Sequence, residues 1–150
     1  MPVLLENKKA RFDYEILETF EAGLSLKGWE VKSLKNKRGS MIGSRVLVRG
    51  NEAFLVGFDI PPYQPNNMPS NYEEQRTLKL LLTKKEIKYL SGKLSQKGLT
   101  IVPLKCYIKN NLIKLEIALV KGKKKFDKRE KIKKRDTERD IEREMKARLR

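Results

Sequence analysis

Lysine and arginine side chains crowd the last thirty residues of the chain, where their density suits the binding of phosphate groups. Residues 121–150 hold 15 basic and 7 acidic side chains, a net charge of +8, and residues 1–120 hold 20 and 12. This density predicts a polyanionic partner, with RNA the leading choice; the alternative is a solvated charged helix without a partner. The densest run contains Lys123, Lys124, Lys125, Asp127, Lys128 and Arg129.

Two smaller basic groups lie in the first 120 residues. One is formed by Lys8, Lys9 and Arg11, and the other includes Lys32 and Lys35. Cations at these places could hold RNA phosphates, although each group taken alone is equally compatible with ordinary solvated surface. Trp29, the single tryptophan, is expected to pack in the core rather than to stack on a base.

Catalytic chemistry finds little support in the residue types. The chain has no histidine, which removes the commonest general base and any histidine-containing zinc site. Its single cysteine, Cys106, lies in an apolar run and is expected to be a small buried hydrophobe. Residues 39–44 lack the Gly-Lys-Ser/Thr ending of a phosphate loop, and Glu73 and Glu74 belong to a polar segment. We therefore expect no catalytic residue, no metal site and no cofactor.

The chain is long enough for one hydrophobic core. We expect residues 1–120 to form an RNA-binding domain and residues 121–150 to form a basic tail. No signal peptide or membrane span is recognisable, which predicts a cytoplasmic protein without membrane contact. We expect a monomer.

Hydrophobic periodicity in the first half predicts two kinds of element. Alternating apolar residues predict a strand over 12–20, and three- and four-residue spacings predict a helix over 21–35. Two strands at 46–48 and 53–56 flank Gly50 and Asn51, which suit a tight hairpin. The segment 61–75 is rich in proline and is expected to be a surface loop.

Stronger local signals occur in the second half. Thr83 and Glu86 have the spacing of a capping box, so a helix should begin there and end at Gly98. Two long strands, 99–109 and 112–120, should be joined by the turn Asn110-Asn111, with one face of the second strand in the core and the other in water.

These elements predict a mainly β (α+β) fold. Five or six strands with two or three packed helices suit a small antiparallel oligonucleotide-binding-type barrel that closes its own edges, and an open α+β sandwich is the alternative. The tail cannot form a core of its own. Because Ile141, Met145 and Leu149 recur every four residues, we expect the tail to be disordered when free and helical when bound.

Five short blocks, in order and in register along nearly the whole chain, resemble the small protein B family, the SsrA-binding or tmRNA-binding proteins. The blocks are Asn-Lys-Lys-Ala-Arg at 7–11, Phe-Glu-Ala-Gly-Leu at 20–24, Gly-Trp-Glu-Val-Lys-Ser-Leu at 28–34, Leu-Leu-Leu at 80–82 before Glu86-Ile87, and Lys-Gly-Lys-Lys-Lys at 121–125 before Asp-Lys-Arg at 127–129.

The resemblance implies an RNA-binding adaptor without enzyme activity. Such a protein binds the tRNA-like domain of tmRNA and delivers alanyl-tmRNA, with elongation factor Tu and GTP, to stalled ribosomes. Its tail enters the empty mRNA path near the decoding centre. Trans-translation then rescues the ribosome and tags the nascent peptide.

The resemblance also implies which residues face RNA. Those in the domain would be Glu30, Lys32, Ser33, Arg76 and Lys79, and the tail that senses the ribosome would begin with Lys123, Lys124, Asp127, Lys128 and Arg129. Glu30 could accept from a base amino group or a ribose hydroxyl; alternatively, it is a surface glutamate paired with a lysine.

Four residues depart from the family pattern. Phe12 stands where many members have histidine, and Tyr72 and Glu74 replace a frequent histidine and proline. Leu78 stands where an arginine is common. These departures concern the RNA contacts of the loop.

Two other classes of function are compatible with a basic domain and tail. One is a structural ribosomal or ribosome-biogenesis protein that binds RNA. The other is a nuclease that uses carboxylates and a metal ion, which would require a catalytic role for a residue such as Glu30.

Overall fold

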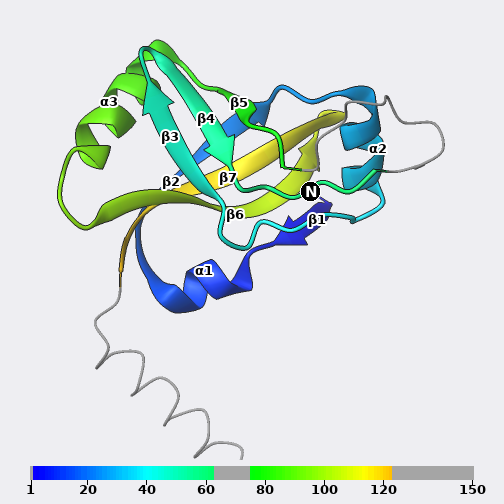
Figure 1. Cartoon of the computed structure of the whole chain (residues 1–150), viewed down its shortest axis with the longest axis horizontal. Helices are drawn as coiled ribbons and strands as arrows, with labels where there is room; N and C mark the ends of the chain where they lie inside the picture. The colour runs from blue at the N-terminus through cyan, green and yellow to red at the C-terminus, as the bar shows by residue number, and fades with distance from the viewer. Residues whose placement is uncertain (1, 63–74, 123–150) are drawn as a thin grey trace, which may run out of the picture.

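The computed structural model describes residues 2–62 and 75–122 (Figure 1). In chain order the elements are β1 (Val3–Glu6), α1 (Lys8–Asp13), β2 (Tyr14–Leu24), α2 (Gly28–Lys35), β3 (Arg45–Arg49), β4 (Glu52–Val56), β5 (Leu78–Leu81), α3 (Lys84–Leu94), β6 (Leu99–Lys109) and β7 (Leu112–Gly122).

The strands form one antiparallel sheet in the order β1-β6-β7-β2-β5-β4-β3. The sheet curls, so that β3 approaches β6, and α3 packs against both strands. Within the described residues the two end strands, β1 and β3, are not paired with each other. The mainly β, oligonucleotide-binding-type fold is confirmed, but the predicted closure of the barrel is wrong, because β1 and β3 remain unpaired ends of the sheet.

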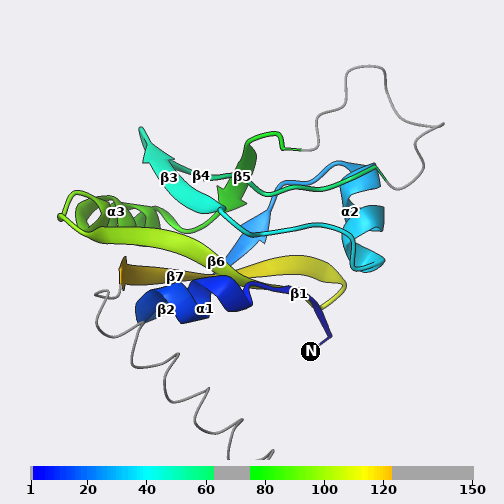
Figure 2. The same ribbon diagram turned by 60° about the horizontal axis from the view of Figure 1, so that its bottom comes forward.

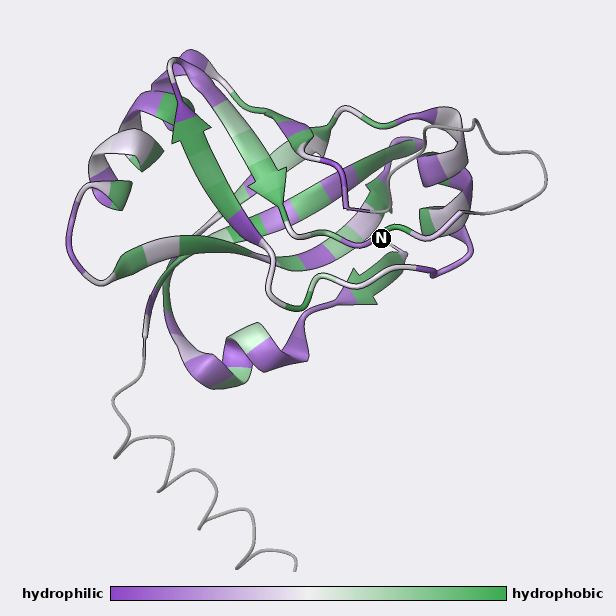
Figure 3. Ribbon diagram, viewed as in Figure 1, coloured by the Kyte–Doolittle hydropathy of each residue, from purple (hydrophilic) through white to green (hydrophobic). Residues whose placement is uncertain are grey.

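The main core fills the inside of this curl. Four leucines there are at most 1% exposed: Leu34 of α2, Leu55 of β4, Leu80 of β5 and Leu115 of β7. Figure 3 shows the hydrophobic residues concentrated along β3 and β6, whereas α1 and α2 carry many hydrophilic ones. Cys106 is fully buried in this core, as predicted.

A second, smaller cluster lies on the outside of the sheet, under α1 (Figure 2). Ala10 of α1 packs there with Val102, Leu104, Ala118 and Val120. The prediction of one wet face for the last long strand therefore fails at its carboxyl end. Between Ile117 and Val120 every side chain is buried, because α1 covers the face that would otherwise meet water.

Three predicted local structures are confirmed. The β3–β4 hairpin turns at Gly50 with a positive φ of 61°, and the β6–β7 hairpin turns at Asn110 and Asn111 with φ of 52° and 62°. Thr83 caps α3: its Oγ1 accepts from the Glu86 amide at 3.2 Å, and its own amide donates to the Glu86 carboxylate at 3.1 Å. The helix ends at Leu94, however, four residues before the predicted end at Gly98.

Other boundaries differ from the sequence-based expectation. Residues 8–13 form α1, so the strand predicted from Phe12 begins at Tyr14. That strand continues to Leu24 and replaces the first part of the helix predicted over 21–35. Pairing explains the change, because Gly23 lies opposite both Lys114 and Leu81, and a Cβ on Gly23 would lie 3.1 Å from the Cβ of Leu81.

Some predicted features lie outside the described residues. These include the loop residues 63–74, with Tyr72 and Glu74, and the tail residues 123–150. The first two residues assigned to the tail, Lys121 and Gly122, belong to β7. In the parts of the chain that the structure describes, every helix is too short or too polar to span a membrane.

Candidate RNA-binding site

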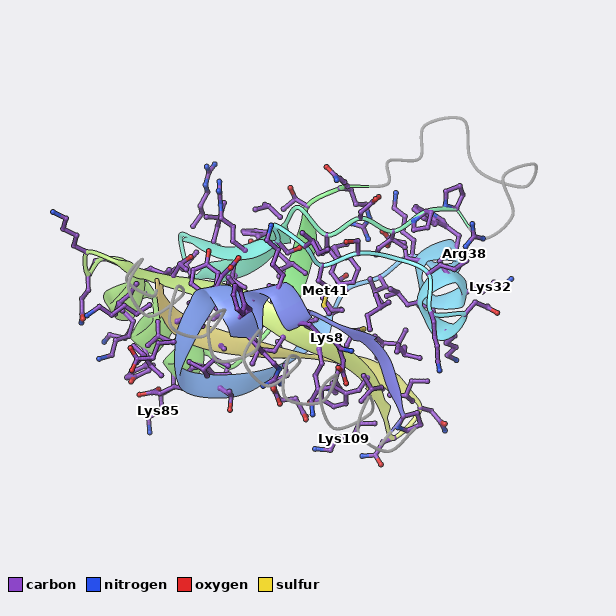
Figure 4. The ribbon with its side chains drawn as sticks, turned by 90° about the horizontal axis from the view of Figure 1, so that it is seen from below. Lys8, Lys32, Arg38, Met41, Lys85 and Lys109 are labelled. Carbon is purple, nitrogen blue, oxygen red and sulfur yellow. The ribbon has the colours of Figure 1, made fainter. Side chains whose placement is uncertain are left out.

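Four of the predicted RNA-binding residues lie on α2, where two are buried and two are exposed. Its helical period turns Glu30, Ser33 and Leu34 into the protein and leaves Lys32 and Lys35 exposed. Only the two lysines can therefore meet a partner without a rearrangement of the helix. Their charges project from the end of the molecule that α2 occupies, as Figure 4 shows for Lys32.

Glu30 is a buried charge, with 1% of its surface exposed. One carboxylate oxygen accepts from the Lys27 amide at 2.7 Å, which satisfies a free donor at the start of α2. Both oxygens accept from Arg76: Nε donates to Oε2 at 2.9 Å and Nη2 donates to Oε1 at 2.6 Å. This two-pronged pairing is the strongest geometry for a carboxylate and a guanidinium. Glu30 thus pairs with an arginine 46 residues away, rather than with a neighbouring lysine on the helix surface.

The Arg76 guanidinium makes further bonds within the protein. Nη2 also donates to the Ser25 carbonyl at 3.2 Å, and 24% of the side chain is exposed. Most of the Arg76 donors are therefore directed at Glu30 and Ser25, although the family resemblance predicted that this residue would face RNA. The structure places Arg76 as a link between α2, the end of β2 and the start of β5.

Ser33 makes a second link from the same helix. Its hydroxyl donates to the Pro61 carbonyl, and the side chain is fully buried. Pro61 and Arg76 lie on the two sides of residues 63–74. The buried face of α2 thus holds the chain at both of these places.

Two neighbouring residues at the start of β5 lie in different surroundings. Lys79 is exposed and its Nζ lies 3.2 Å from the carboxylate of Glu52, with about half of each side chain in water. Such an exposed pair is weak, so Lys79 can exchange it for a phosphate at little cost. Leu78, one of the departures from the family pattern, is fully buried. In this chain position 78 belongs to the core.

The amino-terminal cations lie on α1, well apart from α2 in Figures 1 and 4. Lys8 and Lys9 are exposed, and Arg11 is half-exposed with Nη2 3.5 Å from Glu116. Asn7 caps this helix and is itself buried: its Oδ1 accepts from the Ala10 amide at 3.2 Å, and its Nδ2 donates to the Pro103 carbonyl at 2.9 Å. The structure thus presents two separate basic surfaces, one on α1 and one on α2.

The predicted tail residues are not placed by this geometry. Lys123, Lys124, Lys125, Asp127, Lys128 and Arg129 lie outside the described residues. Their role stays a prediction.

A polar cluster on the outer face of the sheet was missed by the sequence analysis. The Tyr107 hydroxyl donates to Glu21, and Lys109 Nζ lies 3.3 Å from both oxygens of that carboxylate. The hydrogen bond from Tyr107 is the main cause that lowers the pKa of Glu21. Desolvation opposes it, and the hydrogen bond and charge of Lys109 lower the pKa further. Burial, and then Glu21, raises the pKa of Tyr107. No local pattern could reveal this cluster, because Glu21 is 86 residues from Tyr107 and 88 from Lys109.

The described residues offer chemistry for binding. Burial raises the pKa of the Cys106 thiol to about 12, so it is protonated and inert at neutral pH. Within the described ranges no group of three or more Cys, Asp and Glu residues could hold a metal ion. The exposed lysines on the helices and strands carry ammonium groups, and such groups bind phosphates.

A family model and individual proteins similar to this chain all belong to one family. A model of the SmpB protein family matches residues 4–147. An SsrA-binding protein from Nostoc punctiforme is 47% identical over 145 residues, covering 97% of this chain and 94% of that protein. One from Pelotomaculum thermopropionicum is 49% identical over 148 residues, covering 99% and 96%. One from Mycoplasma mycoides subsp. mycoides is 50% identical over 137 residues, covering 91% and 93%.

A solved structure is similar in fold as well as in sequence. It is described as "tmRNA-SmpB: a journey to the center of the bacterial ribosome", and one of its chains is 46% identical to this one. The TM-score is 0.69, with 83% of this chain and 87% of that chain covered.

Proposed function

Because this chain belongs to the SmpB protein family, we propose that it is an RNA-binding adaptor that binds the tRNA-like domain of tmRNA and brings it to stalled ribosomes for trans-translation. The observation that carries this proposal is sequence identity of 46–50% over 83–99% of the chain. The matching proteins are named SsrA-binding proteins, and the matching solved structure is described by the words tmRNA and SmpB. The family resemblance seen in the five sequence blocks is confirmed.

The geometry supports a division of roles among the predicted RNA-binding residues. In our proposal, the exposed cations Lys8, Lys9, Arg11, Lys32, Lys35 and Lys79 hold phosphates. The buried residues Glu30 and Ser33 act indirectly. Glu30 positions Arg76, and Ser33 positions the backbone at Pro61. This assignment keeps buried residues in structural roles and gives the RNA the side chains that it can reach.

The remaining parts of the proposal concern the ribosome. The tail, beginning at Lys123, Lys124, Lys125, Asp127, Lys128 and Arg129, occupies the mRNA path near the decoding centre, as a segment that is disordered when free and helical when bound. The protein travels with alanyl-tmRNA, elongation factor Tu and GTP. It acts in the cytoplasm as a monomer and performs no catalytic step of its own.

A gel-shift competition tests the RNA partner. The full-length protein should bind the tRNA-like domain of tmRNA far more tightly than a generic structured RNA of equal length at physiological salt. Because several phosphates are neutralised, log affinity should fall with log salt concentration with a slope of several units. Equal affinity for the two RNAs would contradict the proposal.

A matched pair of variants tests the surface. Replacement of Lys32 and Lys35 by glutamate should weaken binding at least about tenfold, because it removes two phosphate contacts and adds repulsion. The control replaces two exposed lysines of α3, Lys85 and Lys88, by glutamate, which changes the net charge equally; Lys85 lies at the opposite end of the molecule from Lys32 in Figure 4. An equal loss in both proteins would show that only the net charge matters. Co-sedimentation with ribosomal subunits that needs neither tmRNA nor stalling would favour a structural ribosomal protein instead.

A further inference from the structure

The strand β2 has a free edge along most of its length. It pairs with β7 from Tyr14 to Gly23, but with β5 only at Gly23 and Leu24. Within the described residues no second strand lies beside it between Tyr14 and Ala22, and no other element donates or accepts a backbone hydrogen bond there. Backbone groups on such an edge can pair with a strand from another chain.

Two exposed apolar side chains lie beside this edge. Leu17, in β2 itself, is 44% exposed, and Tyr89, on α3, is 40% exposed. The Tyr89 ring is held next to β2, because its centroid lies 6.0 Å from that of Phe20 and its hydroxyl donates to Glu18 at 2.6 Å. A strand that pairs with the backbone here would therefore also find side chains to pack on.

A bulge in β2 sets which side chains an incoming strand would meet. The pairing of β2 with β7 shifts between Ile16 and Glu18, so Leu17 is an extra residue. Ile16 lies opposite Val120, which packs under α1, and Glu18 lies opposite Leu119, which packs in the main core. Because residues opposite each other share a face of the sheet, the bulge turns Glu18 and the glutamate three positions before it to the same face.

These two glutamates are available to a partner. Glu15 and Glu18 are exposed, and neither forms an ion pair with another described residue. Two lysines lie nearby without pairing with them: Lys121 is opposite Glu15, and Lys93 Nζ lies 5.5 Å from the centre of the Tyr89 ring. Lysines farther away matter less, because physiological salt screens exposed charges over about 8 Å.

The charges of this edge disfavour two occupants and favour a third. A second copy of β2, paired antiparallel about Glu18, would bring glutamates together, and like charges directly opposite each other destabilise a sheet. RNA phosphates would be repelled by the same carboxylates. A strand with lysine or arginine at alternate positions would instead place cations against Glu15 and Glu18.

We propose that the free edge of β2 binds an extended segment of a partner protein, rich in lysine or arginine, as an added strand. Backbone hydrogen bonds to residues 15–21 supply affinity, and Glu15 and Glu18 select cationic side chains. The neighbouring side chains of the segment pack on Tyr89 and Leu17. This inference goes beyond the proposed function, because it adds a protein partner on a surface that leaves α1 and α2 free for RNA.

The experiment uses the full-length protein and a short fluorescent peptide of alternating lysine and valine. A peptide of alternating glutamate and valine is the charge control, and the lysine peptide with methyl groups on alternate backbone nitrogens is the control for strand pairing. The protein variant combines Glu15→Gln and Glu18→Gln. Its matched control combines Glu6→Gln and Glu52→Gln, because these exposed glutamates lie on β1 and β4, which do not pair with β2.

Fluorescence anisotropy should show that the lysine peptide binds at least about tenfold more tightly than the glutamate peptide. The protein with Glu15→Gln and Glu18→Gln should lose about fivefold to tenfold in affinity, whereas the matched control should change by less than about twofold. Methylation of the peptide should abolish binding, because it removes the donors that pair with β2. Amide exchange of residues 15–21 should slow when the lysine peptide is added.

Four results would overturn the inference. Exchange of residues 15–21 that the lysine peptide leaves unchanged would show that no strand is added. Equal losses of affinity in the two glutamine proteins would show that only net charge matters. Slow exchange of these amides in the free protein would mean that the edge already has an occupant within the chain. Weaker binding of the tRNA-like domain by the protein with Glu15→Gln and Glu18→Gln would assign the edge to RNA.

Failure of the proposed function is seen separately from these results. It would appear in the gel shift as a wild-type protein that does not prefer the tRNA-like domain, whatever the peptide does.

Discussion

At the scale of single residues, the ion pair between Glu30 and Arg76 contrasts with the one between Lys79 and Glu52. The first is buried on the carboxylate side and forms two short hydrogen bonds, and the second is half in water. A buried pair that loses one partner leaves a charge without compensation, whereas an exposed pair contributes little. The two pairs should therefore respond very differently to the loss of their glutamates.

We expect Glu30→Ala to lower the free energy of unfolding by about 2–3 kcal/mol, because Arg76 and the Lys27 amide both lose an acceptor. Glu52→Ala, the matched control, should change it by less than about 0.5 kcal/mol. Urea denaturation of both variants measures the difference. RNA affinity adds a further readout: if Glu30 acts through Arg76, then Glu30→Ala has no additional effect in an Arg76→Ala protein, whereas a direct RNA contact would give additive losses.

Cys106 gives a prediction about alkaline pH. Its thiol has an ordinary pKa of 9.0, which burial raises to about 12 in the folded protein. Above pH 9 the unfolded chain loses this proton while the native protein keeps it, so the stabilisation that is complete below pH 9 is lost as the pH rises towards 12. The loss is at most about 1.4 kcal/mol per pH unit.

The comparison with Cys106→Ala isolates this effect from the titration of the lysines. The stability of the wild type relative to the variant should decrease between pH 8.5 and about 10.5 in urea denaturation series. A difference that is constant over this range would mean that the thiol ionises equally in both states.

At the scale of elements, α1 is a short helix that tertiary contacts hold in place. Six residues are too few for an isolated helix in water. Asn7 connects it to β6 and to the turn before β3 through the carbonyls of Pro103 and Met41, while Ala10 packs on the sheet. One side chain thus joins three parts of the chain.

Asn7→Ala should therefore cost more than the loss of an ordinary cap. We expect a decrease of about 2–3 kcal/mol in the free energy of unfolding. The buried Pro103 carbonyl loses the Asn7 donor, the Met41 carbonyl keeps only the Ser44 amide, and the helix loses its cap. Thr83→Ala, which removes the exposed cap of α3, should cost about 1 kcal/mol. Equal costs in thermal or urea denaturation would show that the bonds to Met41 and Pro103 contribute nothing.

The sequence predicted the elements that nearby residues determine, and it failed for those that distant partners determine. The capping box of α3 and the two tight hairpins are determined by residues within four positions of each other, so their signals are local. The strands β1 and β5 and the helix α1 have only four to six residues each, and distant partners determine their structure. The residues 21–24 resemble a helix in their spacing, but pairing with β7 and β5 makes them a strand. The site divides in the same way: exposed lysines were predictable, and the partner of Glu30 was not.

At the scale of the whole molecule, the sheet ends two residues later than the predicted boundary of the domain. Lys121 and Gly122 pair with Glu15 and Tyr14 of β2, and Lys121 also pairs with Leu99. A chain that ends at Gly122 therefore keeps every strand of the sheet.

We expect this truncated protein to fold and to retain most of its affinity for the tRNA-like domain of tmRNA, because the α1 and α2 surfaces are intact. It should fail to support tagging of peptides on stalled ribosomes, since that step is assigned to the tail. A gel shift and a translation assay with mRNA that lacks a stop codon measure the two properties. Loss of RNA affinity in the gel shift, with an unchanged Tm, would show that the tail recognises the RNA.

The order of strands in the sheet also sets the timing of folding during synthesis. The strand β7 is the last of the described strands to be made. The central strand β2, which pairs with β7 along most of its length, ends 88 residues before β7 begins. At about 5–20 residues per second, β2 waits about 4–18 s on the ribosome for its partner. Throughout that interval its backbone donors and acceptors form an open edge that other growing chains can pair with. The protein is thus most prone to aggregation before its own translation is complete, and a factor that shields β2 co-translationally should raise its yield more than one that acts after release.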